Sequence, residues 1–198
     1  MTDTNTTAHR ASPVVSGDGK LIESELQRLT SVVELIFFAY RDFTGESDAA
    51  LKQLNFGRAH HRVLHFVTWR PGLRVADLLD ILKITKQSLA RVLKQLIDRG
   101  FVVQEAGVAD RRERRLYPSP EGQKLAEQLR ALQTKRIARA LNEIEPQAQG
   151  GALRFLLALT APADKVNLEQ SLKSAGMDVS ADAPPGQRRD AKSTAKVG

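Results

Sequence analysis

The chain has 198 residues and a formal net charge of +7, with no cysteine and 5 % aromatic residues. The absence of thiols excludes disulfides, thiolate metal ligands and thiol nucleophiles, and the few aromatics disfavour a protein that stacks single-stranded bases. No apolar run approaches the roughly 20 residues of a membrane helix, and no apolar signal segment opens the chain. We therefore expect a cytoplasmic protein with a polyanionic partner, either nucleic acid or an acidic membrane surface.

Both ends of the chain are polar. Residues 1–19 consist largely of Thr, Ser, Asp, Asn and Gly, and residues 173–198 are rich in Asp, Ala, Pro, Gly, Lys and Arg. Such segments bury too little apolar surface to fold. The sequence thus predicts one domain at residues 20–172 between two disordered tails.

The first predicted helix covers about residues 21–43. Its apolar residues alternate at spacings of four and three, as in a heptad seam: Ile22, Leu26, Leu29, Val33, Ile36 and Tyr40. A seam of this kind packs either within its own chain or against a second copy, and the sequence leaves both interpretations open.

The middle of the chain predicts several short elements. Helices are expected over 56–69, which Pro71-Gly72 ends, over 75–82, and from after Thr85 to before Gly100. Strands are expected over 101–105 and 114–117. Ser119 and Pro120 then suit the cap and first residue of a long fifth helix, and a Leu-rich sixth helix follows around 152–159. The predicted fold class is α+β, mainly helical.

The helix after Thr85 has two chemically different faces. Leu89, Val92, Leu93, Leu96 and Ile97 share one apolar face. The polar positions carry Lys86, Gln87, Ser88, Arg91, Lys94 and Gln95, whose groups suit base edges and phosphates. A solvated amphipathic helix would look the same. Residues 83–115, however, hold nine Lys or Arg against four acids, so +5 of the net +7 lies here, and this favours a DNA-binding face.

Ordered motifs in this region resemble the MarR family. They are Pro71-Gly72-Leu73, the runs 75–79, 84–88 and 96–102, and Asp110-Arg111-Arg112 ahead of Ser119 and Gly122. Residues 57–66 and 78–96 look like the PetP-like branch of that family. The resemblance spans roughly residues 20–165.

This resemblance implies a homodimeric winged helix-turn-helix regulator of transcription. The DNA-binding lobe would cover about 56–119, with dimerisation helices at about 21–43 and 120–172. Helix 86–98 would enter the major groove, and the wing 103–117 would carry Asp110, Arg111, Arg112 and Arg114. Arg112 would enter the minor groove, braced by Asp110. Two-fold symmetry implies an inverted-repeat operator with half-sites about 10 bp apart.

The same resemblance implies a subunit interface and an effector. The interface would use Ile22, Leu26, Leu29, Val33, Ile36, Leu153, Leu156 and Leu157. Family members often bind small anionic aromatic molecules between the dimerisation helices and the DNA-binding lobe. No residue here identifies that ligand.

Three residues or segments depart from the family pattern. Lys83 occupies a turn position where many members have Gly, which costs on the order of 1 kcal/mol if the backbone there is left-handed. Arg74 replaces the usual Ser or Thr cap of the next helix. Arg115 and Pro118 replace apolar residues, so we expect a short returning strand.

Other functions receive less support from the sequence. His61 and His65 lie four apart on one helix beside His60, but a zinc site needs further ligands, so packing is the better interpretation. No phosphate loop or nucleophile–base pair is visible, so we predict neither an enzyme nor a cofactor. A non-specific DNA-packaging protein, or a helical protein-interaction module with a basic wing, are the remaining alternatives.

Overall fold

The computed structural model describes residues 23–107, 113–177 and 179. The chain divides into two compact units, residues 1–136 and 137–198. The first unit contains α1 (Glu23–Lys52), α2 (Arg58–Trp69), β1 (Leu73–Arg74), α3 (Val75–Leu82), α4 (Lys86–Asp98), β2 (Val102–Ala106), β3 (Arg114–Pro118) and most of α5 (Pro120–Asn142). The second contains the end of α5, then α6 (Pro146–Ala158) and α7 (Pro162–Ser174). This order confirms the mainly helical α+β fold.

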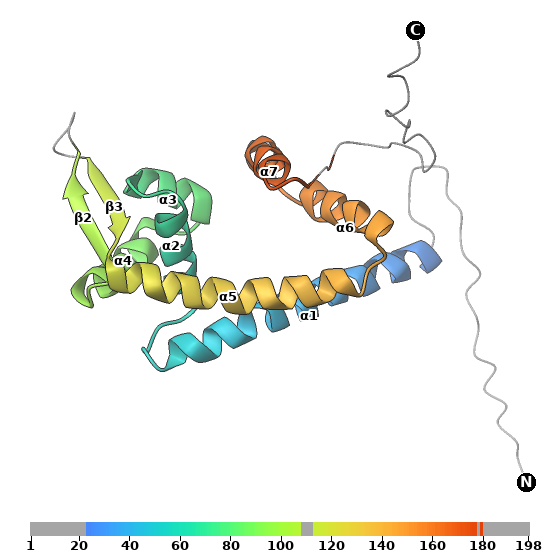
Figure 1. The fold of residues 1–198 in the computed structure, drawn as a ribbon, viewed down its shortest axis with the longest axis horizontal. Coiled ribbons are helices and arrows are strands. Elements are labelled where there is room, and N and C mark those ends of the chain that lie inside the picture. The colour runs from blue at the N-terminus through green and yellow to red at the C-terminus, as the bar shows by residue number, and fades with distance from the viewer. Residues whose placement is uncertain (1–22, 108–112, 178, 180–198) are drawn as a thin grey trace, which may run out of the picture. The chain divides into compact units, whose positions relative to one another are not determined.

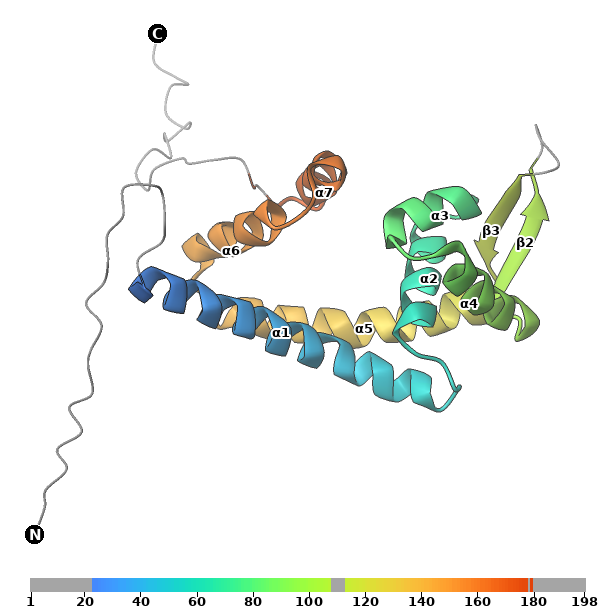
Figure 2. The same ribbon diagram turned by 180° about the vertical axis from the view of Figure 1, so that it is seen from behind.

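Within the first unit, α2, α3 and α4 form a three-helix lobe with a small sheet. Figures 1 and 2 show α2, α3 and α4 gathered beside the hairpin of β2 and β3. The sheet has the order β1-β3-β2 and is antiparallel throughout. Leu73 of β1 pairs with Leu116 in the middle of β3, and Val102 of β2 pairs with Pro118 at the end of β3. This is the winged helix-turn-helix arrangement that the sequence predicted.

A single apolar core holds these elements together. Leu51, Leu64, Leu78, Leu89, Leu96, Leu116 and Leu129 are almost completely buried within it, and they come from α1 to α5 and β3. Burying one such side chain contributes roughly 1.5–3 kcal/mol. The core therefore fixes the relative positions of α2, α3, α4 and the sheet.

Several elements differ from the sequence prediction. Helix α1 continues to Lys52 rather than ending near residue 43, because Thr44, Ser47 and Leu51 are buried in the lobe. β3 has five residues, as many as β2, so the expectation of a short returning strand was wrong. Pro118 lies beyond the part of β3 that pairs with β1 and has a strand partner only on the β2 side, at Val102.

Two elements had no signal in the sequence. β1 has two residues, too few for a periodic pattern, and it forms because β3 offers a pairing edge. α7 buries none of its side chains and lacks an apolar stripe. It ends at Ser174, two residues beyond the predicted end of the domain at residue 172. Of the two predicted tails, 1–19 and 173–198, the structure describes only residues 173–177 and 179.

The turn between α3 and α4 carries the predicted backbone cost. Lys83 has φ 51° and ψ 44°, which is the left-handed region. Its backbone N–H donates to the carbonyl of Leu79 at 2.9 Å and closes α3. The lysine thus tolerates a conformation that glycine adopts without strain.

The start of α5 is packed directly against the loop that follows α4. The Ser119 hydroxyl donates to the carbonyl of Gly100 at 2.6 Å and accepts from the N–H of Gly122 at 2.9 Å, which confirms it as the cap. A Cβ on Gly122 would lie 1.9 Å from the carbonyl oxygen of Phe101. That atom belongs to the backbone, so a side chain here requires the helix to move.

We therefore expect Gly122→Ala to lower the free energy of unfolding by about 1–3 kcal/mol or more, in urea titrations. Gly45→Ala is the matched control, because a Cβ there meets nothing within 4 Å and alanine stabilises a helix by roughly 0.5–1 kcal/mol. Equal stability of the two variants would contradict the close approach of α5 to Phe101.

Candidate nucleic-acid interface

Helix α4 buries one face and exposes the other, as predicted. Leu89, Val92, Leu93 and Leu96 are buried in the core. The six polar residues proposed as DNA contacts are all exposed: Lys86, Gln87, Ser88, Arg91, Lys94 and Gln95. The core therefore holds the helix so that these side chains face solvent together.

The N-terminus of α4 is capped by Thr85. Its hydroxyl oxygen accepts from the N–H of Ser88 at 3.2 Å, and its hydroxyl group donates to the Ser88 hydroxyl at 2.9 Å. The first amides of the helix stay open to solvent at its positive end, beside the charge of Lys86. This arrangement suits a phosphate group.

Besides Ser88, two residues of the exposed face have side-chain partners. Lys94 pairs with Asp98 at 2.6 Å, with 75 % of the lysine side chain exposed. An exposed pair of this kind contributes little stability, so Lys94 can exchange its partner for a phosphate. Gln95 contacts His60 of α2, with 2.6 Å between the amide oxygen and Nε2.

The wing is described only in part. Asp110, Arg111 and Arg112 lie outside the described residues. Arg114 is exposed at the beginning of β3, where it pairs with Ala106 of β2. β2 contacts α4, so the hairpin that carries Arg114 is packed on the same lobe as α4.

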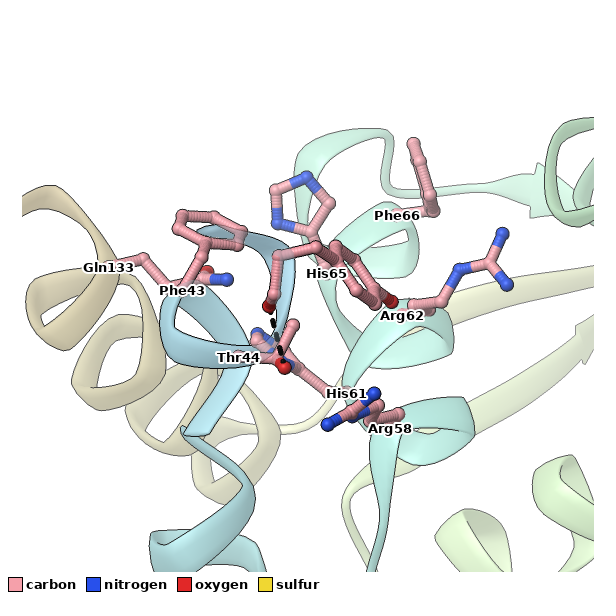
Figure 3. Close-up of a pocket in the computed structure, with 9 residues that line it drawn as sticks. Phe43, Thr44, Arg58, His61, Arg62, His65, Phe66 and Gln133 are labelled. Atoms are coloured by element: carbon pink, nitrogen blue, oxygen red, sulfur yellow. Dashed lines mark hydrogen bonds between the residues drawn. The ribbon is translucent and has the colours of Figure 1, made fainter. Parts of the chain in front are cut away.

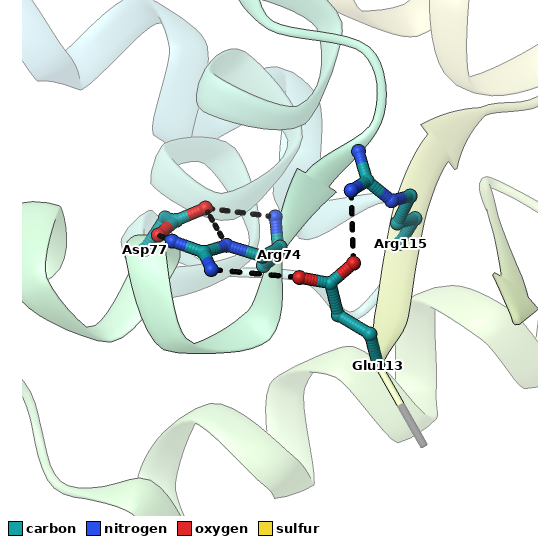
Figure 4. Close-up of polar contacts among 4 residues, drawn as sticks. All are labelled: Arg74, Asp77, Glu113 and Arg115. Atoms are coloured by element: carbon teal, nitrogen blue, oxygen red, sulfur yellow. Dashed lines mark hydrogen bonds and ion pairs between the residues drawn. The ribbon is translucent and has the colours of Figure 1, made fainter. Parts of the chain in front are cut away.

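An ionic network joins the base of the wing to α3 (Figure 4). Glu113 accepts from Arg115 at 2.8 Å and from Arg74 at 3.4 Å. Arg74 also binds Asp77 side chain to side chain at 2.5 Å, and Asp77 accepts from the Arg74 backbone N–H at 3.3 Å. The hydrogen bonds from Arg74 lower the pKa of Asp77. Asp77 therefore satisfies the N–H of the cap residue Arg74, while the side chain of Arg74 accepts no hydrogen bond from the first turn of α3 as Ser or Thr would.

A cavity of about 230 Å³ lies between α1, α2 and α5 (Figure 3). Its lining is aromatic and basic: Tyr40, Phe43, Thr44, Arg58, His61, Arg62, His65, Phe66 and Gln133. Arg58 pairs with Asp48 at 2.7 Å, and Arg62 donates to the carbonyl of Leu82 at 3.0 Å. The contact between Arg62 and Leu82 could not be predicted from the sequence, because the two residues are 20 positions apart and every residue has a backbone carbonyl.

The three histidines of α2 divide between two sides of the helix. His61 and His65 line the cavity, whereas His60 contacts α4. Within the described part of the chain, no three His, Asp or Glu side chains group as a metal site would require. His61 is buried, and burial, followed by the charge of His65, lowers its pKa, although Asp48 opposes this. Burial and Arg130 also lower the pKa of His65.

These lowered pKa values make stability depend on pH. Below the ordinary value of 6.5, the unfolded chain binds protons that the folded chain does not, so the free energy of unfolding falls as the pH is lowered from about 7 to 5. We expect His61→Gln, which cannot be protonated, to show a shallower loss than the parent in urea titrations across this range. An identical dependence of the unfolding free energy on pH in the two proteins would show that His61 does not contribute to it.

The apolar seam of α1 is largely exposed in the single chain. Leu26, Leu29, Val33 and Ile36 are between 39 % and 55 % exposed, and Phe37 is 69 % exposed; Ile22 lies outside the described residues. In the second unit Leu153 is half-buried, Leu156 is exposed and Leu157 is buried. The interpretation of the seam as an intrachain core is therefore disfavoured for most of its length.

No helix of residues 23–107 and 113–177 is long and apolar enough to cross a membrane.

Known proteins with a similar sequence or structure support the winged helix-turn-helix fold described above. A model described as the MarR family matches residues 54–113. The HTH-type transcriptional regulator PetP of Rhodobacter capsulatus is 43 % identical over 137 residues, covering 69 % of this chain and 82 % of that protein. FabT of Streptococcus pneumoniae, solved in complex with DNA, has a TM-score of 0.59 at 14 % identity and covers 76 % of this chain and 99 % of its own.

A MarR family regulator from Listeria monocytogenes, complexed with a 26mer DNA, gives a TM-score of 0.58 at 19 % identity. The match covers 75 % of this chain and 97 % of that one. At identities of 14 % and 19 %, these two matches show that the chain has the same fold as the solved structures.

Proposed function

Because the chain belongs to the MarR family and is a regulator of transcription rather than an enzyme, we propose that it binds a specific double-stranded operator as a homodimer. The observation that carries the proposal is the exposed face of α4, where six Lys, Arg, Gln and Ser side chains stand together over a buried apolar face. A regulator of this kind acts in the cytoplasm, where it meets its DNA.

Helix α4 is the proposed major-groove reader. Gln87 and Arg91 are exposed and long enough to reach base edges. Lys86 and Lys94 suit the flanking phosphates. Ser88 contributes less than the sequence suggested, since its hydroxyl group already contacts Thr85.

The wing is the proposed minor-groove contact. Asp110, Arg111 and Arg112 keep the roles that the family resemblance gives them, with Arg112 inserted and Asp110 orienting it. Arg114 would contact the neighbouring phosphates. The network of Glu113 with Arg74 supports this proposal, since it fastens the base of the wing to α3.

A homodimer is the proposed assembly. The exposed seam of α1 at Leu26, Leu29, Val33 and Ile36 offers apolar surface for a second copy. In the second unit, Leu156 of α6 is also exposed, and Leu153 and Leu157 keep the interface role that the family resemblance implies. Contiguous exposed apolar residues mark interaction surfaces in soluble domains. Two copies related by a two-fold axis would read two inverted half-sites.

Selection from random duplexes at about 150 mM salt, which weakens non-specific phosphate binding, tests specificity and assembly together. We expect enrichment of an inverted repeat with half-sites about 10 bp apart. Gln87→Ala should change the preferred base at one position of each half-site, and Gln128→Ala, an exposed glutamine of α5, should not.

Three outcomes would argue for other functions or assemblies. Binding without enrichment indicates the DNA-packaging alternative, and no binding indicates a protein-interaction module. Enrichment of a single half-site contradicts the dimer.

We further propose that the cavity between α1, α2 and α5 holds the effector, a small aromatic anion. Its aromatic walls, from Tyr40, Phe43 and Phe66, suit an aromatic ring, and its basic side chains suit a carboxylate. Arg62 connects this cavity to the DNA-reading helices through its bond to Leu82 at the end of α3. A ligand that draws Arg62 away removes that bond and favours a state with weaker DNA binding.

Benzoate serves as the probe for this site. We expect millimolar benzoate to raise the Tm of the protein and to weaken operator binding, and Arg62→Gln to remove both effects. Arg70→Gln is the control, because Arg70 is an exposed arginine near the end of the same helix and does not line the cavity. An unchanged Tm with benzoate would contradict the proposal.

A further inference from the structure

His60 connects the start of α2 to the DNA-reading face of α4. Its Nδ1 lies 3.1 Å from the backbone nitrogen of Gly57, and its Nε2 lies 2.6 Å from the amide oxygen of Gln95. The two residues border a hollow of about 370 Å³ that Gly57 and Arg91 also line. The histidine is half-buried, whereas Gln95 is exposed.

The backbone determines which nitrogen of His60 carries the proton. The N–H of Gly57 can only donate, so Nδ1 must accept and the proton of the neutral ring sits on Nε2. That N–H then donates to Gln95, whose amide must turn its oxygen toward the ring. The hydrogen bond at the start of α2 therefore sets the orientation of the Gln95 amide.

The imidazole ring is also held in place by packing. It stacks on Phe56 with 4.5 Å between ring centroids and 14° between the planes. Phe56 is buried and lies in the core, and the guanidinium of Arg99 lies 4.6 Å from its ring centroid. A ring fixed by two hydrogen bonds and a stacking partner has little freedom to release Gln95.

We propose that His60 is a positioning residue that makes Gln95 a hydrogen-bond donor toward DNA. With its oxygen bound to His60, the amide turns its NH₂ group toward solvent and toward an acceptor on DNA. Phosphate oxygens and the N7 and O6 atoms of guanine are such acceptors. Adenine requires a donor and an acceptor from the same amide, so Gln95 does not read adenine in the two-bond mode open to a free glutamine.

This inference rests on the proposed DNA binding by α4, but its geometry can be tested without DNA. Nitrogen-15 NMR of the full-length protein at neutral pH distinguishes the two imidazole nitrogens. We expect the proton of His60 on Nε2. A proton on Nδ1 would overturn the proposal, whatever the protein does with DNA.

The functional test uses His60→Asn, Gln95→Ala and the double variant. Asparagine keeps a neutral acceptor for Gly57 but lacks the outer nitrogen that reaches Gln95, so the cap stays and the link is lost. On the selected operator we expect each single variant to bind roughly three- to tenfold more weakly. The double variant should bind no more weakly than Gln95→Ala, because His60 acts through Gln95.

The sequence dependence of the loss identifies the acceptor. An equal loss on every duplex indicates a phosphate oxygen, and a loss confined to duplexes with guanine at one position indicates a base edge; both support the proposal. A loss confined to adenine, an unchanged affinity of His60→Asn, or additive effects in the double variant would overturn it. If the parent enriches no operator, the proposed specific DNA binding fails, and the NMR result alone decides the orientation of Gln95.

Discussion

The structure depends on the burial of one face of α4. Leu89, Val92, Leu93 and Leu96 insert into a core shared by α2, α3 and the sheet. Each of these side chains contributes roughly 1.5–3 kcal/mol, whereas an exposed ion pair such as Lys94–Asp98 contributes at most about 1 kcal/mol. Apolar packing therefore decides where the helix lies and which way it is turned. The polar residues of α4 face solvent together because the apolar ones fix how the helix is turned.

Polar contacts at the edge of this core connect it to the surfaces around it. Arg62 joins the cavity to the end of α3, and Arg74 joins the start of α3 to the base of the wing. His60 joins the cap of α2 to Gln95. Each contact links an element to the helix-turn-helix through one side chain. A ligand or a substitution at any of them can therefore shift the reading helices without disturbing the core.

Part of the candidate site could be predicted from the sequence. The bounds of α3, the cap at Thr85 and the exposed positions of α4 follow from local rules, because a helical period and a capping hydroxyl act within a few residues. The contact between His60 and Gln95 spans 35 positions and depends on how α2 packs against α4. For the three histidines of α2 the sequence favoured packing over a metal site, but their spacing along one helix does not show that His60 contacts α4 while His61 and His65 line the cavity.

The sequence by itself determined the fold class, the two faces of α4 and the family, because these follow from apolar periodicity and the order of short motifs. Tertiary structure decided the rest. Four features depend on residues far apart in the chain: the length of α1, the pairing of β1, the bond of Arg74 to Glu113 and the orientation of Gln95. Folding brings such residues together, and a buried or hydrogen-bonded partner then decides what each one does.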